Sequence, residues 1–213
     1  MDTDQILDDT ILRHPTLAQC RADISAAYQT LAGTFRRGGR LLICGNGGSF
    51  SDAEHIAGEL AKAFLLPRPL TGEQKARFCE AGDIGAALAK GLQRALPAIP
   101  LGTAGALSSA IANDNGQEFI YAQQVLAYGT AGDTLLAIST SGRSVNVVYA
   151  AQTAKTMGLT VVALTGKDAG PLGERSDITI RVPAEETLLV QELHLPVYHA
   201  LCAMVEQEMF GGD

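Results

Sequence analysis

Five short apolar runs recur along the chain, and segments with helical spacing of apolar residues separate them, which restricts the possible folds more than any other feature. The runs occupy residues 41–44, 98–101, 134–138, 160–164 and 178–182. Short, almost continuous apolar runs are typical of strands buried on both faces of a parallel sheet. The helical patterns lie at 51–64, 104–112, 117–127, 144–157 and 186–210. We therefore predict an α/β fold, a three-layer sandwich around a five-stranded parallel sheet with right-handed crossovers.

Two segments lie outside this alternation. Residues 1–37 have apolar residues at helical intervals that are interrupted at Pro15, and Gly38-Gly39 follows, so we predict two N-terminal helices. Residues 67–96 open with Pro67-Arg68-Pro69 and continue with loose helical spacing, which indicates a helical insertion. The insertion is either a surface elaboration that contacts other subunits or a lid over an active site. We treat residues 1–213 as a single domain.

Charge and composition exclude several classes of protein. The chain has 16 Lys and Arg against 23 Asp and Glu, a net charge of −7, and contains no local basic patch, so we expect no nucleic-acid partner. No apolar run is long enough to predict a membrane span, and the acidic Met1-Asp2-Thr3-Asp4 start is unlike a secretory signal. We expect a cytoplasmic protein that contacts no membrane. The scattered cysteines favour reduced thiols over a zinc ribbon or a disulfide framework.

A glycine-rich loop follows the first predicted strand. Gly45-Asn46-Gly47-Gly48-Ser49 lies between residues 41–44 and a predicted helix. Glycines permit a tight turn and close approach of the backbone to a ligand, and a helix N-terminus attracts anions. The loop lacks the Lys-Ser/Thr of a Walker motif and the glycine spacing of a dinucleotide fingerprint.

A hydroxyl-rich loop follows the third predicted strand. Ser139-Thr140-Ser141-Gly142-Arg143-Ser144 places four hydroxyls around one glycine just before a helix. Hydroxyl and backbone donors at such a position can surround a phosphate monoester. Single serines here would also serve as helix caps, but capping does not explain the whole cluster. We predict phosphate binding.

Titratable residues occur on two predicted helices. His55 and Glu59 are four residues apart on one helix face, where they can act as acid and base, bind a metal or form a solvated pair. The last helix carries Gln191, His194 and His199 in an apolar sequence. Helical spacing does not choose between the two histidines. Pro196 lies between them, and we expect it to bend the helix.

Together these motifs resemble the sugar isomerase (SIS) domain family, and within it the bacterial phosphoheptose isomerases. The segments that carry the resemblance are Cys44-Gly45-Asn46-Gly47-Gly48-Ser49, His55 with Glu59, Asn113-Asp114, Ser139-Thr140-Ser141-Gly142-Arg143-Ser144, and Gln191 with His199. The resemblance implies a flavodoxin-like winding of the five strands and a homotetramer with active sites between subunits. It also implies conversion of D-sedoheptulose 7-phosphate to D-glycero-D-manno-heptose 7-phosphate, an early step towards the heptoses of lipopolysaccharide.

The resemblance also implies roles for individual residues. Glu59 would be the general base and His199 the general acid. The phosphate would be held by Ser139, Thr140, Ser141 and Ser144. The remaining substrate contacts would come from Asn46, Gly47, Gly48, Ser49, Glu59, Asn113, Asp114 and Gln191. Some family members bind zinc, and the matching residues here are His55, Glu59, Gln191 and His199.

Two other functions share this fold. The chain is also similar to the noncatalytic SIS-domain protein that associates with the bacterial initiator DnaA, which works by binding and not by turnover. A complete acid/base pair would have no explanation in such an adaptor. An isomerase of another ketose phosphate would use the same chemistry on a different carbon skeleton.

Overall fold

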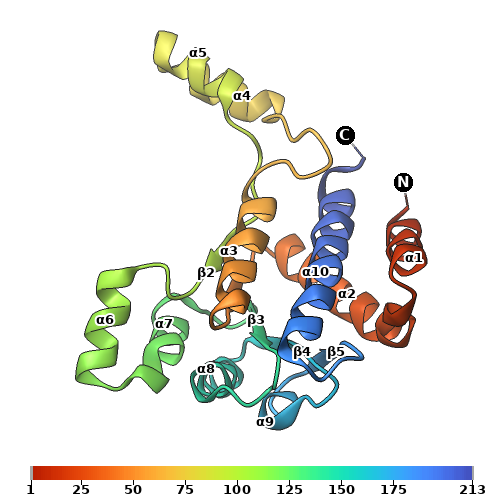
Figure 1. Cartoon of the computed structure of the whole chain (residues 1–213). Coiled ribbons are helices and arrows are strands. Elements are labelled where there is room, and N and C mark those ends of the chain that lie inside the picture. The colour runs from red at the N-terminus through yellow and green to blue at the C-terminus, as the bar shows by residue number, and fades with distance from the viewer. Residues whose placement is uncertain (1, 213) are drawn as a thin grey trace.

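The computed structural model describes residues 2–212 and contains a five-stranded, all-parallel sheet with the order β2-β1-β3-β4-β5 (Figure 1). The strands are β1 (Leu41–Cys44), β2 (Ala98–Pro100), β3 (Thr134–Ser139), β4 (Thr160–Thr165) and β5 (Ile178–Arg181). This confirms the predicted α/β fold, and the strand order is the flavodoxin-like one. Each strand begins where the sequence places it and ends within one residue of its expected end.

The sheet separates two apolar cores, because successive side chains of a strand point to opposite faces. In β1, Leu41 and Ile43 enter one core, whereas Leu42 and Cys44 enter the other. Helices α2 (Arg21–Arg36), α3 (Gly48–Ala61) and α10 (Thr187–Phe210) contribute to the first core. Helices α7 (Ile120–Tyr128) and α8 (Val145–Thr156) contribute to the second. The result is the predicted three-layer sandwich.

The N-terminal region contains α1 (Thr3–Arg13), a 3-10 helix η1 (Pro15–Cys20) and α2. The interruption at Pro15 therefore occurs as the sequence predicts, with the proline in the first position of η1, where its missing N–H is not needed. Pro196 lies inside the last helix, as the sequence predicts, and α10 is helical from Thr187 to Phe210.

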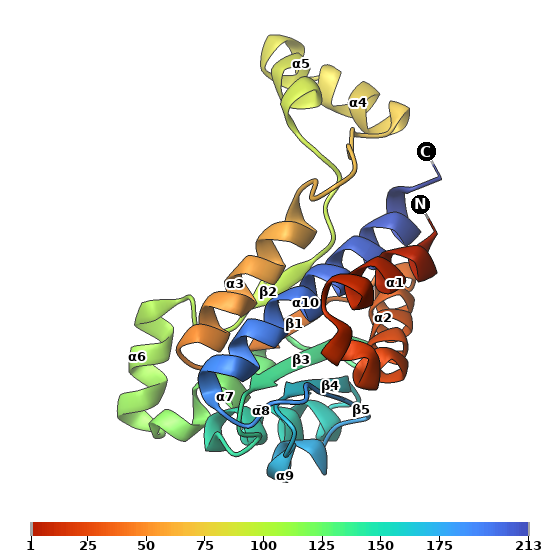
Figure 2. The same cartoon turned by 45° about the vertical axis from the view of Figure 1, so that its right-hand side comes forward.

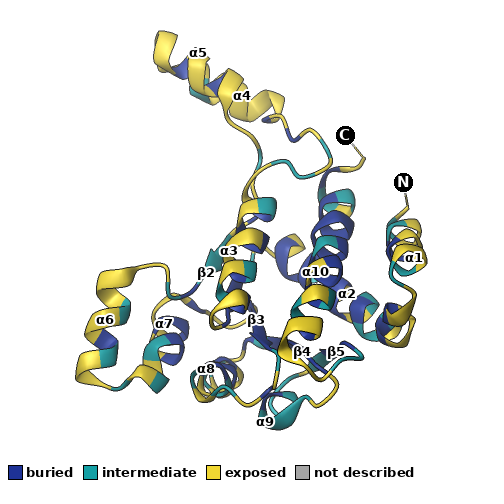
Figure 3. Ribbon diagram, viewed as in Figure 1, coloured by how far each residue is buried: buried dark blue, intermediate teal, exposed yellow. Residues whose placement is uncertain are grey.

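Helix α10 lies at the centre of the molecule. By length and composition alone it could cross a membrane, which the sequence analysis did not anticipate. However, 61% of its most apolar window is buried inside the fold. Figure 3 shows buried residues of α10, in dark blue, beside α2. The helix is therefore apolar because it forms much of the core.

The segment between α3 and β2 projects from the body of the molecule (Figures 1 and 2). It contains α4 (Gly72–Cys79) and α5 (Gly82–Gly91), which pack against each other and are mostly exposed (Figure 3). The remaining short helices are α6 (Gly105–Asp114), η2 (Gln117–Phe119) and α9 (Gly170–Gly173). The helix predicted at 117–127 is thus divided into η2 and α7.

Candidate active site

The loops that follow β1 and β3 lie side by side at one edge of the sheet. Strands β1 and β3 are parallel neighbours, and the loops that follow them, 45–47 and 140–144, leave at the same edge of the sheet. The strand order changes direction at this pair, because β2 lies on one side of β1 and β3–β5 lie on the other. Such switch points are where open α/β sheets bind ligands. The two motifs singled out in the sequence therefore meet at the position that the topology favours for binding.

The glycine loop forms the first turn of α3. The sequence predicts that this helix begins near Ser51, but it begins at Gly48, because Ser49 and Phe50 donate backbone hydrogen bonds to Asn46 and Gly47. Gly47 has a φ of +57°, which favours glycine. The N-terminal amides of α3 consequently lie within the loop itself.

Asn46 is held in place by two residues that the sequence analysis missed. Its side-chain amide exchanges two hydrogen bonds of 2.9 Å with the amide of Asn146 on α8. The hydroxyl of Tyr121 on α7 donates to Asn46 Oδ1 at 3.2 Å and to the carbonyl of Gly45. The sequence separations are 100 and 75 residues, so no local pattern in the sequence indicates these contacts.

The serine loop is ordered by its own hydrogen bonds. Ser139 is buried at the end of β3 and donates through Oγ to Ser144 Oγ at 3.1 Å. Ser144 is the N-cap residue of α8, although its side chain makes no capping hydrogen bond, and the Ser141 hydroxyl accepts from the backbone N–H of Arg143 at 3.2 Å. Thr140 is half-buried beside them. These hydroxyls lie close to the N-terminus of α8, where a phosphate is favoured.

A polar cavity of about 420 Å³ lies between the two loops. Asn46 and Ser144 line it, together with Gln117, Glu118 and Asn146, which the sequence analysis did not single out. Asn113 and Asp114, predicted to contact the sugar, are exposed at the end of α6 and do not line this cavity. The side-chain Nδ2 of Asn113 donates a hydrogen bond to Asp114 Oδ1 at 2.8 Å.

The predicted acid/base residues meet because α3 and α10 lie side by side and run in the same direction (Figures 1 and 2). Gln191 lies against the start of α3, since a Cβ on Gly48 would come within 2.4 Å of Gln191 Nε2. Two turns further along, the rings of His199 and His55 are 5.0 Å apart. The parallel packing of α3 and α10 therefore places Gln191 and His199 beside the helix that carries His55 and Glu59.

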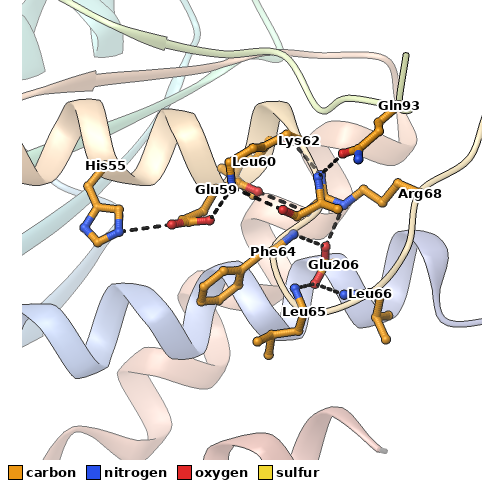
Figure 4. A network of polar contacts seen from close by, with 11 residues as sticks. His55, Glu59, Leu60, Lys62, Phe64, Leu65, Leu66, Arg68, Gln93 and Glu206 are labelled. Atoms are coloured by element: carbon orange, nitrogen blue, oxygen red, sulfur yellow. Dashed lines mark hydrogen bonds and ion pairs between the residues drawn. The ribbon is translucent and has the colours of Figure 1, made fainter. Parts of the chain in front are cut away.

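Glu59 and His199 both lie next to His55. Glu59 Oε1 is 3.1 Å from His55 Nε2, and Lys62 Nζ donates to Glu59 Oε2 at 3.2 Å (Figure 4). The other ring nitrogen of His55 is 3.0 Å from the Tyr198 hydroxyl. Burial raises the pKa of Tyr198, so the hydroxyl keeps its proton. His55 therefore lies between Tyr198 and a carboxylate.

His199 has unused hydrogen-bonding capacity. Within residues 2–212 its Nε2 is buried and has no hydrogen-bond partner. Burial, with the neighbouring His55, lowers the pKa of His199, while Glu59 opposes this shift. The ring is therefore held neutral, and a neutral imidazole can still donate a proton to a substrate oxygen. The ring borders a groove of about 600 Å³ between α1 and α10.

The structure distinguishes the two histidines of α10, which the sequence spacing did not. His194 is fully buried, and burial lowers its pKa to about 4, with the backbone of Thr165 opposing this shift. It faces neither Glu59 nor His55 in any described contact. Only His199 joins the cluster of titratable side chains.

The four residues matching zinc ligands have suitable donors, since imidazole and carboxylate both bind zinc. His55 and Glu59 are in contact, and His199 presents an unpartnered Nε2. Even so, the described part of the chain contains no group of three His, Cys, Asp or Glu residues arranged to hold a metal. The donor chemistry of these four side chains fits zinc.

Comparisons with known proteins found similar sequences and similar folds. The family model for the SIS domain matches residues 80–166. The phosphoheptose isomerase of Halorhodospira halophila is 38% identical over 212 residues, which cover 98% of this chain and 94% of that protein. Solved structures of phosphoheptose isomerases are also similar. That from Neisseria gonorrhoeae has a TM-score of 0.74 and 30% identity over 94% of both chains. That from Francisella tularensis has a TM-score of 0.73 and 29% identity over 96% of both. The chain therefore belongs to the phosphoheptose isomerase family of SIS-domain sugar-phosphate isomerases.

Proposed function

We propose that this isomerase converts D-sedoheptulose 7-phosphate to D-glycero-D-manno-heptose 7-phosphate in the cytoplasm, with Glu59 as base and His199 as acid. The observation that carries the proposal is that the Glu59 carboxylate and the ring of His199, whose Nε2 has no partner among the described residues, both lie next to His55. His55 and Glu59 are on α3, the helix that begins in the glycine loop. The relatives with full-length similarity are named for the same substrate class.

The reaction moves one proton between adjacent carbons through an enediolate. Glu59 would take the proton from carbon and return it to the neighbouring carbon, while His199 would donate a proton to the carbonyl oxygen and recover one from the hydroxyl that becomes the new carbonyl. The hydrogen bond from His55 to Glu59 orients the carboxylate, and the half-buried position of Glu59 excludes much of the solvent. Gln191 lies where it can connect the sugar with the glycine loop.

The phosphate would bind at the serine loop. Ser139, Thr140, Ser141 and Ser144 offer hydroxyl donors beside the N-terminus of α8, and Ser139 and Ser144 already hold each other at 3.1 Å. Asn46 on the facing loop would contact the sugar hydroxyls together with the backbone of Gly47 and Gly48. Zinc, where present, would be held by His55, Glu59, Gln191 and His199 and would polarise the carbonyl as a Lewis acid.

We also propose that the protein is a homotetramer. Exposed leucines occur on α10 and around the groove beside His199; they are Leu12, Leu65, Leu188, Leu189 and Leu195. Apolar side chains concentrated beside an active-site histidine are typical of a subunit interface. Light scattering of the purified protein measures the number of subunits directly, and a monomer would contradict this assembly.

Turnover of D-sedoheptulose 7-phosphate by the Glu59→Gln and His199→Ala variants tests the function. We expect kcat to fall about 10²- to 10⁴-fold in each, the usual contribution of a positioned acid or base. In deuterium oxide, Glu59→Gln should also lose the incorporation of deuterium at carbon. Glu174→Gln, which changes an exposed carboxylate whose described ion pair is with Arg175, is the matched control and should behave as the wild type.

Each outcome has a clear meaning. If neither variant lost activity, the assigned acid and base would be wrong. If the wild type turned over a different ketose phosphate and not the seven-carbon one, the chemistry would stand and the substrate would be wrong.

A further inference from the structure

The chain leaves α3 only two residues after Glu59, and the side chain of Arg68 binds the end of this helix together with the backbone N–H of Leu96, which donates to the Leu60 carbonyl at 3.0 Å. The last carbonyls of a helix have no partner within it. Arg68 supplies partners for two of them, since Nη1 donates to the Leu60 carbonyl at 2.7 Å and Nη2 donates to the Glu59 carbonyl at 3.1 Å (Figure 4). The positive charge of Arg68 also interacts favourably with the negative C-terminal end of the helix dipole. The backbone carbonyl of Glu59 is therefore hydrogen-bonded to the guanidinium of Arg68.

Arg68 is in turn fixed by Glu206 of α10. Arg68 Nε donates to Glu206 Oε1 at 2.7 Å, and both side chains are 0% exposed. The same carboxylate accepts the backbone N–H groups of Phe64, Leu65 and Leu66 at 2.7 to 3.0 Å. Glu206 thus accepts four hydrogen bonds, from the arginine and from the turn that follows α3.

The stem of the insertion joins at the same place. The Ala63 N–H donates to Gln93 Oε1 at 2.8 Å, and the Arg94 N–H donates to the Arg68 carbonyl at 2.8 Å. The ring of Phe210 lies 4.7 Å from the Arg68 guanidinium and 4.8 Å from that of Arg94. Contacts from α3, α10 and the insertion therefore converge on one buried ion pair.

We propose that Arg68 and Glu206 are positioning residues for the isomerisation: their buried ion pair clamps the end of α3 to α10 and so holds Glu59 opposite His199. This rests on the proposed function, in which Glu59 is the base. An apolar pair could fill the same space without the cost of burying two charges. It could not supply directional bonds to the Glu59 and Leu60 carbonyls, which the planar guanidinium provides.

The test compares kcat and KM for sedoheptulose 7-phosphate in Arg68→Met and Glu206→Gln, both corrected for the folded fraction. A small displacement of a catalytic group is able to reduce turnover about 10²-fold. We expect a loss of this size in kcat for Arg68→Met, a smaller loss for Glu206→Gln, and little change in KM, because the proposed phosphate loop is on another part of the sheet. Ile24→Ala, a core truncation on α2, is the control for lost stability and should leave kcat of the folded enzyme unchanged.

Glu206→Gln keeps the shape of the side chain, so this variant still tests the proposal if Arg68→Met does not fold. Unchanged kcat in the variants that fold would overturn the proposal, as would an equal loss in Ile24→Ala. Hydrogen exchange provides a second readout, since Glu206→Gln should expose the amides of Phe64, Leu65 and Leu66 and the last turn of α3. A wild type without activity on the heptose phosphate would contradict the proposed function alone, and the exchange measurement would then still test the clamp.

Discussion

Buried histidines in this protein have contrasting surroundings. The partly buried ring of His199 contacts His55, Phe64 and Tyr198 and borders a groove, and its buried Nε2 has no hydrogen-bond partner within residues 2–212. His194 is completely buried, and neither of its ring nitrogens has a hydrogen-bond partner within residues 2–212. A buried polar group without a partner reduces stability. Burial also disfavours the charged form of His194 and lowers its pKa, so the ring makes the fold sensitive to acid.

Replacing His194 with leucine should remove part of the acid sensitivity of the protein. Burial lowers the pKa of His194 from 6.5 to about 4, so between these pH values the unfolded chain binds a proton that the folded protein does not. Stability is then lost as the pH falls through this window, by about 3 kcal/mol in total for a shift of this size. We expect His194→Leu to lose less stability than the wild type between pH 7 and pH 4, measured by urea unfolding at one protein concentration. Equal losses would show that His194 does not contribute.

At the scale of elements, the turn between β3 and α8 depends on close contact with the loop after β4. Gly142 has a φ of +64°, and a Cβ at this position would lie 1.9 Å from the Ala169 carbonyl oxygen. Leu172 donates a backbone hydrogen bond to the Gly142 carbonyl at 3.1 Å. The proposed phosphate loop is therefore shaped by a segment that the sequence analysis did not connect with it.

Gly142→Ala should consequently raise KM for the sugar phosphate and lower stability. The alanine would have to adopt a strained φ, and it would also push against the backbone of Ala169, so we expect a loss at or above the usual range of about 1–3 kcal/mol for such strain. Gly38→Ala is the matched control, because its φ is +76° and a Cβ there would meet nothing within 4 Å. Thermal unfolding and steady-state kinetics compare the two. An effect on KM no larger than that of Gly38→Ala would contradict this role for the turn.

At the scale of the whole molecule, the insertion is attached firmly but packs on little besides itself. Its stem pairs Pro69 with Gln93 in antiparallel fashion and is bonded to α3 and α10, whereas α4 and α5 pack chiefly against each other. Ile84 on α5 is 74% exposed. Figure 2 shows the helical part standing away from the sheet and from the switch-point loops. This arrangement favours a surface elaboration over a lid.

Removing α4 and α5 should therefore leave the fold and the isomerase activity largely unchanged. We would replace residues 71–92 with Asn-Gly, a sequence suited to a two-residue turn between antiparallel strands, and keep the stem with Arg68 and Gln93. Circular dichroism and turnover of the shortened protein would measure the outcome. A folded protein with strongly reduced kcat would support the lid, and loss of a tetramer without loss of folding would identify a subunit contact.

Much of the architecture was determined by the sequence itself. The five strands and the positions of the two loops follow from short-range patterns, because a buried strand must be apolar and a strand-to-helix turn needs glycine or hydroxyl residues at defined places. The same local spacing correctly puts His55 and Glu59 on one helix face, and they are 3.1 Å apart in the structure. These features depend on neighbours within a few residues of each other.

Only the tertiary structure decided which side chains meet across the fold. The parallel packing of α3 and α10 selects His199 over His194 and brings together Arg68 and Glu206, which are 138 residues apart in the sequence. Local sequence patterns also did not predict the pairing of Asn46 with Asn146 or the exposed position of Asn113 and Asp114. Helical periodicity defines the faces of one helix, but the rotation and offset of two packed helices depend on the whole core. For this reason the loops were found from the sequence, whereas the partners that position the proposed base were not.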